Sequence, residues 1–372
     1  MKKKISVLHV VSSFNNSEGG PPIAINNIAY ALRNKQFKNN LITTSTEHIK
    51  NKNFTSIIRG ELLTKKFYFP TLLTIFNLWK NIKKNKIIHI HNYWNFVVFL
   101  ALQFAIIHNK KIIITPHGSF DKFNIKKSYL KKLIFYNLIG KYQIKKVSSI
   151  HYLNKNEKKN SFIIKTINSK LYILSNYVDL INIKRKKIIL KKKKINFTYL
   201  GRLDTIKNIE YQIYLINELI KINKNIFFHI IGPNQNNYKK KLLNLINRLK
   251  ISNYIKFYKP IYNEKKYSWL KYSDFIFLTS HYECNSMLAL EVMACGGLLL
   301  SKRSCNLTDL FNSNSAIMLN NNPKKASKQI LKLFQNKSKM KQTRTNAIDF
   351  TKKFNFDTFE KKISKLYNDN TN

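Results

Sequence analysis

Two glutamates, Glu283 and Glu291, stand where a short apolar stretch passes into a helix-forming segment. The apolar run 274–278 is typical of a buried parallel strand, and the residues after it favour a helix. Glu283 falls in the turn, and Glu291 lies eight positions later, about two helical turns on. Both carboxylates can therefore face the cleft beyond the strand's carboxyl end, where open α/β sheets bind ligands. A helix cap and a solvated helix face are the alternative roles for such a pair.

The first residues of this helix add a second chemical feature. The backbone amides of Ser286, Met287 and Leu288 stand at the expected helix start, where N–H groups have no partner inside the helix. Free amides and the helix dipole together form a favourable site for phosphate. We therefore expect these three residues to contribute to the binding of a phosphorylated ligand.

Two cations follow another expected strand, over 195–200. Arg202 and Lys207 share the short segment between this strand and the next helix. Arginine offers a fork of donors that matches phosphate oxygens, and lysine offers a movable point charge. Together they could neutralise a departing diphosphate. Chance placement is the alternative, because 67 of the 372 residues are Lys or Arg.

Three histidines lie at the carboxyl ends of strands in the first half of the chain. His117 belongs to Pro-His-Gly after the expected strand 111–115, so its ring is placed to point into a cleft. A structural hydrogen bond is the alternative for this ring. His89 and His91 are interpreted as strand-end packing or as contacts to an acceptor.

Gly19 and Gly20 lie in the loop between the first expected strand, 5–11, and a helix over 23–32. The absence of side chains would let this loop pass close to a ligand. A plain flexible turn is the alternative.

These motifs, taken together, resemble a known family. The glutamate pair followed by Ala-Cys-Gly resembles the signature of glycosyltransferase family 4, which comprises retaining enzymes of the GT-B fold. The resemblance implies that Glu283 contacts the donor sugar, that Glu291 contacts the nucleotide ribose, and that His117 lies beside the sugar.

The resemblance also assigns roles to the loops. It implies that Arg202 and Lys207 hold the leaving diphosphate and that the loop with Gly19 and Gly20 lies in the cleft near the phosphates and the acceptor. The family usually has Gly where this chain has Ser286, so the close approach of backbone to diphosphate differs here. No protein nucleophile is assigned, and the resemblance implies no cofactor and no metal.

Repeated strand and helix units indicate an α/β protein with two parallel-sheet domains. The resemblance implies the GT-B fold, in which two Rossmann-like domains face each other across a cleft. We expect an acceptor-side domain over 1–176 and a nucleotide-sugar domain over 177–354, with a last helix in 355–372 that packs back on the first domain. The basic run 184–194 is expected to be a surface loop.

A lysine-rich segment over 124–146 is expected to form one amphipathic helix. Apolar residues recur along it at helical spacing, and they fit either the protein core or a membrane interface. They are Tyr129, Leu130, Leu133, Ile134, Leu138 and Tyr142.

The predicted function is that of a retaining hexosyltransferase that moves a sugar from a UDP- or GDP-sugar to a glycan or lipid-linked glycan. Synthesis of surface polysaccharide or lipopolysaccharide is the expected context. The replacement of glycine by Ser286 makes a non-catalytic nucleotide-sugar binder the first alternative.

The net charge of +49 raises the second alternative, a nucleic-acid-binding protein. The lysines are spread over nearly the whole chain together with Asn and Ile, which indicates a compositional bias, so we expect no nucleic-acid partner. We expect instead a peripheral protein on the inner face of the cytoplasmic membrane, where anionic lipids attract lysines.

The apolar stretch 96–107 is too short to span a bilayer, and the basic start with the run 5–11 is interpreted as a strand rather than a signal peptide. Cys284, Cys295 and Cys305 show no paired or metal-binding spacing, which fits the cytoplasm.

Overall fold

The structure, a computed structural model, describes residues 4–15, 18–33, 35–45, 51–64, 68–178, 190 and 193–371. The chain forms two compact units. Unit 1 comprises Met1–Tyr177 with Phe356–Asn372, and unit 2 comprises Val178–Asn355. The basic run predicted as a surface loop lies almost wholly outside the described residues.

The core of unit 1 is a parallel sheet in the order β3-β2-β1-β6-β7-β8-β9. The chain changes direction across the sheet between β1 and β6, which are neighbours in space but not in sequence. Its strands are β1 (Ile5–Val11), β2 (Phe37–Thr43), β3 (Ser56–Arg59), β6 (Ile87–His91), β7 (Lys111–Thr115), β8 (Ser149–Tyr152) and β9 (Lys170–Ile173). A small antiparallel pair, β4 (Leu62–Thr64) and β5 (Phe69–Pro70), lies outside this sheet.

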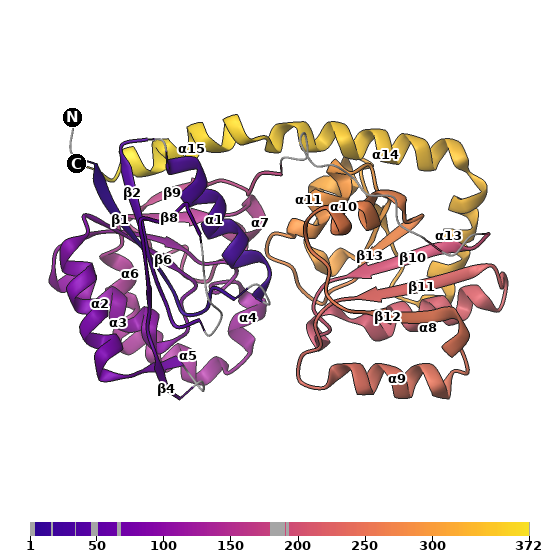
Figure 1. The fold of residues 1–372 in the computed structure, drawn as a ribbon, viewed down its shortest axis with the longest axis horizontal. Coiled ribbons are helices and arrows are strands. Elements are labelled where there is room, and N and C mark those ends of the chain that lie inside the picture. The colour runs from indigo at the N-terminus through magenta and orange to yellow at the C-terminus, as the bar shows by residue number, and fades with distance from the viewer. Residues whose placement is uncertain are drawn as a thin grey trace. The chain divides into compact units, whose positions relative to one another are not determined.

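Helices cover both faces of the unit 1 sheet because successive strand residues point to opposite sides. Val7 packs into the cluster formed by α1 and α15, whereas Leu8 packs into the cluster formed by α2 and α3. Figure 1 shows α15 on one side of this sheet and α2 and α3 on the other. The helices of the unit are α1 (Gly20–Leu32), α2 (Leu72–Lys84), α3 (Phe96–Ile107), α4 (Lys122–Lys126), α5 (Tyr129–Phe135), α6 (Lys141–Lys145), α7 (Lys155–Asn160) and α15 (Phe356–Asn368).

The single helix predicted over 124–146 is wrong. The segment is divided into α4, α5, a π-helical turn over Tyr136–Gly140, and α6. Ser128 separates the first two helices because its backbone adopts the left-handed conformation, with φ of 60°, which ends a right-handed helix. Most of the apolar stripe is also not core: five of its six residues are between 51% and 75% exposed.

Unit 2 has the same plan, with a parallel sheet in the order β12-β11-β10-β13-β14-β15. Here the chain changes direction between β10 and β13. The strands are β10 (Ile195–Leu200), β11 (Ile226–Ile231), β12 (Ile255–Tyr258), β13 (Phe275–Leu278), β14 (Leu299–Ser301) and β15 (Ile317–Met318). The helices are α8 (Ile209–Ile220), α9 (Tyr238–Arg248), α10 (Asn263–Tyr272), α11 (Met287–Ala294), α12 (Thr308–Asn312), α13 (Pro323–Gln335) and α14 (Lys337–Thr351).

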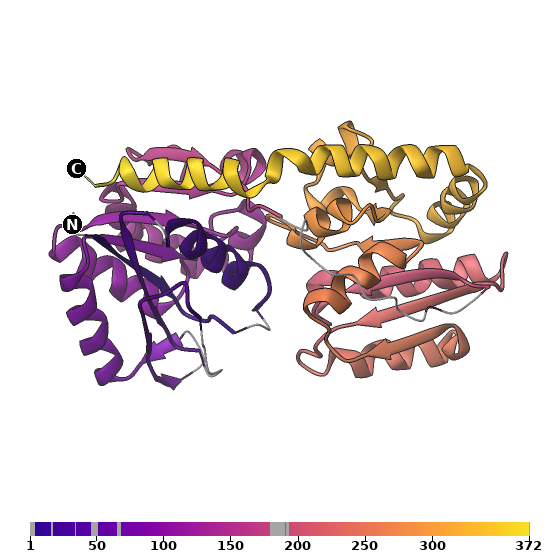
Figure 2. The same ribbon diagram turned by 45° about the horizontal axis from the view of Figure 1, so that its top comes forward.

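Two hydrophobic clusters fill the faces of the unit 2 sheet. Phe277 belongs to the cluster with α8, α9 and α13, and Ile276 belongs to the cluster with α11. In Figure 2, α14 lies over α11, consistent with their contact. The predicted α/β fold with two parallel-sheet domains is confirmed. Among the described residues, no helix combines the length and apolar content required to cross a bilayer.

Candidate active site

The cation and the acid predicted for the donor site meet at the carboxyl edge of the unit 2 sheet. Lys207 follows β10, and Glu283 follows β13, the spatial neighbour of β10 at the point where the strand order reverses. The Lys207 Nζ lies 2.7 Å from the Glu283 Oε1, and both side chains are mostly buried. Such switch points are where open α/β sheets bind ligands.

Hydrogen bonds join the loop after β10 to the loop after β13. The amide of His281 donates to the Ile206 carbonyl at 2.8 Å, and the Thr279 hydroxyl contacts the carbonyl of Asn208 at 3.2 Å. Ser280 Oγ donates to Glu283 Oε1 at 2.5 Å, so this carboxylate oxygen accepts from two groups. The pair is therefore supported by both loops rather than formed by chance contact of long side chains.

Ser286, at the position where the family that the sequence resembles usually has glycine, is the N-cap of α11. Its hydroxyl accepts from the Ala289 amide at 3.2 Å. Serine is one of the favoured N-cap residues, so the helix start forms without glycine. Within the described part of the chain, no hydrogen bond occupies the amides of Ser286, Met287 or Leu288. These amides remain available for a ligand.

Arg202 and Glu291, which were predicted for the same site, have partners other than Lys207 and Glu283. Arg202 reaches the Gln235 Oε1 at 3.5 Å. Glu291 is 4% exposed and pairs with Lys266 of α10, whose Nζ lies 2.6 Å from its Oε1. Burial raises the pKa of Glu291, and the Lys266 charge opposes that shift. Sequence reasoning did not single out Lys266, which is one of many lysines in the chain.

In unit 1, His117 lies in the turn after β7 with a positive φ of 49°. Such a backbone is rare for residues other than glycine and is often found at functional sites. The next amide, of Gly118, donates to Glu157 Oε1 at 2.7 Å, and Leu153 donates to the other oxygen at 2.6 Å. Glu157 thus fixes the turn that carries His117, a role with no signal in its local sequence.

The ring of His117 is hydrogen-bonded inward to His91, with 3.2 Å between Nε2 and Nδ1. Burial lowers the pKa of His117 to about 3. His9, His89 and His91 lie behind it, and each offers a nitrogen within 4.8 Å of the others, a spacing that could hold a metal ion. Their ring nitrogens already bond to protein groups, among them Tyr367 and Thr115 on His89.

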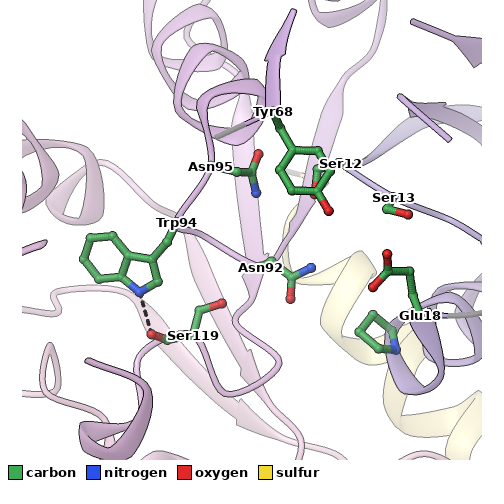
Figure 3. Close-up of a pocket in the computed structure, with 9 residues that line it drawn as sticks. Ser12, Ser13, Glu18, Tyr68, Asn92, Trp94, Asn95 and Ser119 are labelled. Atoms are coloured by element: carbon green, nitrogen blue, oxygen red, sulfur yellow. Dashed lines mark hydrogen bonds between the residues drawn. The ribbon is translucent and has the colours of Figure 1, made fainter. Parts of the chain in front are cut away.

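A pocket of about 210 Å³ opens at the carboxyl edge of the unit 1 sheet (Figure 3). In Figure 3 the polar ends of Glu18, Asn92 and Tyr68 turn toward the same space, and the Trp94 indole donates to the Ser119 carbonyl at 2.6 Å. The lining residues are Ser12, Ser13, Glu18, Pro21, Tyr68, Asn92, Trp94, Asn95 and Ser119.

Gly19 and Gly20 stand beside this pocket, between the lining residues Glu18 and Pro21. Gly19 has a φ of 78° and is the N-cap of α1, and a Cβ at either glycine would have no described atom within 4 Å. The space around the two glycines is open, and the helix begins at Gly20 rather than at residue 23 as expected.

Comparison with known proteins identifies the class of unit 2. Residues 181–350 match the family model described as "Glycosyl transferases group 1". No curated protein matches the sequence. The fold resembles sucrose-phosphate synthase from Thermosynechococcus elongatus, with 12% identity, a TM-score of 0.77 and coverage of 98% of each chain.

Two further solved structures share the fold. HepE of Anabaena in complex with UDP-glucose has 13% identity and a TM-score of 0.77, over 98% of this chain and 99% of that one. WaaG, a glycosyltransferase involved in lipopolysaccharide biosynthesis, has 12% identity and a TM-score of 0.74. The match covers 98% of this chain and 99% of that one. The fold is therefore GT-B. The chain is a glycosyltransferase, which confirms the class of enzyme expected from the sequence.

Proposed function

We propose that the chain is a retaining glycosyltransferase, of the family 4 type, that uses a nucleotide diphosphate sugar. The observation that carries this proposal is the Lys207–Glu283 pair at the switch point of unit 2. Glu283 precedes the N-cap of α11 by three residues, and among the described residues no hydrogen bond occupies the first amides of that helix. Two of the structural relatives, HepE and a trehalose-6-phosphate protein of E. coli, bind UDP-glucose or its fluoro analogue. UDP-sugars are therefore the first donors to examine.

In this proposal, groups held in fixed positions stabilise the negative charge that develops on the diphosphate. Lys207, Arg202 and the amides at the start of α11 would stabilise the leaving group. Glu283 would exchange its bond with Lys207 for bonds to the donor sugar's hydroxyls, so the free enzyme keeps both groups paired until the donor arrives. Glu291, held by Lys266, would accept from the ribose.

Binding of the donor predicts a shift in thermal stability. Because a ligand that binds only the folded state stabilises it by RT ln(1 + [L]/Kd), a concentration of 100 Kd adds about 2.7 kcal/mol. We expect one of UDP or GDP, and its sugar, to raise Tm in differential scanning fluorimetry, and the other to have little effect. The control variant changes Glu218, which forms an exposed ion pair with Lys221 in the same unit.

Replacement of Glu218 by glutamine should leave the nucleotide-induced shift intact, whereas Arg202→Met should reduce it. Absence of any shift with UDP, GDP and their sugars would contradict the proposed donor class. A shift without turnover of the donor would instead support the non-catalytic binder.

The pocket of unit 1 is proposed to hold the acceptor. Its described lining combines Trp94 and Tyr68 with short polar side chains and includes no lysine or arginine, although the chain has 67 basic residues. Aromatic faces and neutral hydrogen-bonding groups suit an uncharged sugar, and the Glu18 carboxylate disfavours an anionic group. We therefore propose an acceptor sugar without a phosphate or carboxylate at the reacting end.

An exposed apolar and basic surface in unit 1 supports a membrane-bound acceptor. Between Lys122 and Lys146 the chain has eight lysines and no Asp or Glu. The exposed apolar residues from α5 to α6, which we name the α5–α6 surface, are Tyr129, Leu130, Ile134, Leu138 and Tyr142. Lysines attract anionic lipid headgroups, and apolar side chains enter the interface between headgroups and acyl chains.

A row of aromatic rings connects the pocket with the α5–α6 surface. Phe69 stacks on Phe96 with 4.4 Å between ring centroids, and Phe96 contacts Phe99 at 5.5 Å. Phe99 contacts Phe135 of α5 at 5.7 Å. Phe69 and Phe96 each follow a pocket residue, Tyr68 and Asn95. This continuity supports a lipid-linked acceptor whose sugar occupies the pocket while its lipid remains in the membrane.

The membrane proposal predicts a loss of vesicle binding when Leu130 and Leu138 are both replaced by glutamate. Each buried leucine contributes about 1.5–3 kcal/mol, so affinity for vesicles that contain phosphatidylglycerol should fall at least tenfold in sedimentation. Ile222→Glu is the control, because Ile222 is similarly exposed, at 60%, but lies two residues beyond the end of α8 in unit 2. Equal binding by the double variant and the wild type would contradict this membrane surface.

A further inference from the structure

A row of buried side chains runs inward from His117 across the unit 1 sheet. His117 contacts His91, the last residue of β6, at 3.2 Å. The other nitrogen of His91, Nε2, lies 3.2 Å from Nδ1 of His9 in β1. Nε2 of His9 lies 3.5 Å from the Asn39 Oδ1 in β2. The four side chains therefore form one continuous row over adjacent strands.

The end of this row at Asn39 determines the direction of its hydrogen bonds. The Asn39 Nδ2 donates to the Ala29 carbonyl at 3.1 Å, and a carbonyl can only accept. The amide oxygen of Asn39 must therefore face His9, so the His9 Nε2 carries a proton and donates it. A neutral imidazole has one N–H, so the His9 Nδ1 is an acceptor.

The same argument then passes outward to His117. Because the His9 Nδ1 accepts, the Nε2 of His91 must donate, which leaves the His91 Nδ1 as an acceptor. His117 must therefore donate to His91 through Nε2. All three rings are neutral in this arrangement, and burial, which lowers the pKa of each, supports it.

We propose that His91, His9 and Asn39 are positioning residues that hold His117 as the Nε2–H tautomer, with the Nδ1 lone pair facing the substrate. Within the described residues no hydrogen bond occupies Nδ1 of His117. The substrate group it meets must be a hydrogen-bond donor, such as a sugar hydroxyl. The substrate part of this inference rests on the proposed function, whereas the tautomer follows from unit 1 alone.

A second row in the same unit is ordered separately and provides a control. His151 donates through Nε2 to the Leu174 carbonyl at 2.8 Å, so its Nδ1 accepts from the Thr115 hydroxyl at 2.9 Å. Thr115 in turn accepts from the Nε2 of His89 at 2.7 Å, and His89 accepts from Tyr367 at 2.5 Å. This row has no hydrogen bond to His117.

The tautomer is tested directly by nitrogen NMR of the full chain labelled with 15N-histidine. The chain has nine histidines, and the His117 signals are assigned by their absence from His117→Gln. At pH 7 we expect Nε2 of His117 to show the shift of a protonated nitrogen and Nδ1 that of an unprotonated one. Protonation at Nδ1, or at both nitrogens, would overturn the proposal, and this result requires neither substrate nor activity.

Variants of His91 test whether the row does the positioning. In His91→Phe the His117 ring loses its inner partner and is free both to rotate and to change tautomer, so we expect averaged shifts from two tautomers. We also expect a kcat/KM about tenfold lower, because the ring then presents Nδ1 to the substrate only about a tenth of the time. In His91→Gln the amide can accept from His117 and donate to His9, so most of the activity should return. His151→Gln, in the second row, should leave both the shifts and the activity within about twofold.

An unchanged His117 tautomer in His91→Phe would refute the positioning role. If that variant does not fold, the wild-type spectrum still decides the tautomer. If the tautomer is as expected but the His91 variants retain full activity, the row is correct and the proposed contact between His117 and the substrate is wrong.

Discussion

Replacement of Lys207 by methionine is expected to lower kcat about 10²–10³-fold, the usual effect of removing one group that stabilises developing negative charge. Methionine keeps the length of the side chain but not its charge. The measurement is the release of nucleoside diphosphate from the donor that stabilises the protein. Lys221→Met is the matched control, because Lys221 also pairs with a glutamate, Glu218, but on the exposed surface of α8. It should leave kcat unchanged.

The partner of Lys207 distinguishes a catalytic pair from a structural one. If Lys207 and Glu283 act on the same donor, Glu283→Gln should also reduce kcat, and the double variant should lose much less than the product of the single effects. The wild type and each single variant should have a similar Tm. Normal kinetics in Lys207→Met would mean that the pair at the switch point only stabilises the loops.

Unit 1 is expected to lose stability as the pH falls from 7 to 4. Burial lowers the pKa of His9 and of His151 from the ordinary value of 6.5 to about 4, so the folded unit excludes protons that the unfolded chain binds below pH 6.5. This contribution to stability is complete above pH 6.5 and disappears toward pH 4. One unit of pKa corresponds to about 1.4 kcal/mol, so His9 alone contributes about 3 kcal/mol.

Tryptophan fluorescence allows the acid effect to be measured for unit 1. Trp79 and Trp94 lie in unit 1 and Trp269 in unit 2, so urea unfolding of Trp269→Phe reports on unit 1. The unfolding midpoint should fall steadily below pH 6.5. His9→Gln, which cannot take up the proton, should show a shallower pH dependence. A midpoint that stays constant from pH 7 to pH 5 is incompatible with neutral buried rings.

Much of the fold could be predicted because buried parallel strands in this chain are nearly continuous apolar runs. The bounds of β1, β7 and β10 are those expected from the sequence. β2 was not predicted because Asn39 and Asn40 interrupt its apolar pattern. Both are buried but satisfied: Asn39 donates to the Ala29 carbonyl, and Asn40 donates to the Asn85 Oδ1 at 2.9 Å. Such pairing depends on segments distant in the sequence and leaves no local pattern.

The candidate site was predictable in its residue types but not in its pairing. Lys207 and Glu283 are 76 positions apart and meet because β10 and β13 are neighbours, although β11 and β12 lie between them in sequence. Local patterns do not reveal that reversal of strand order. They also do not reveal that Glu291 is enclosed with Lys266. The assigned roles of the individual site residues stay predictions until the variants are measured.

The contact between Tyr367 and His89 has a consequence for synthesis of the protein. Tyr367 in α15 is fully buried in the cluster that covers one face of the unit 1 sheet, together with Val7 and Ile87. All of unit 2 is translated before α15. On the ribosome, unit 1 therefore lacks part of its core while the second unit emerges, and the first half to be made is the last to be completed.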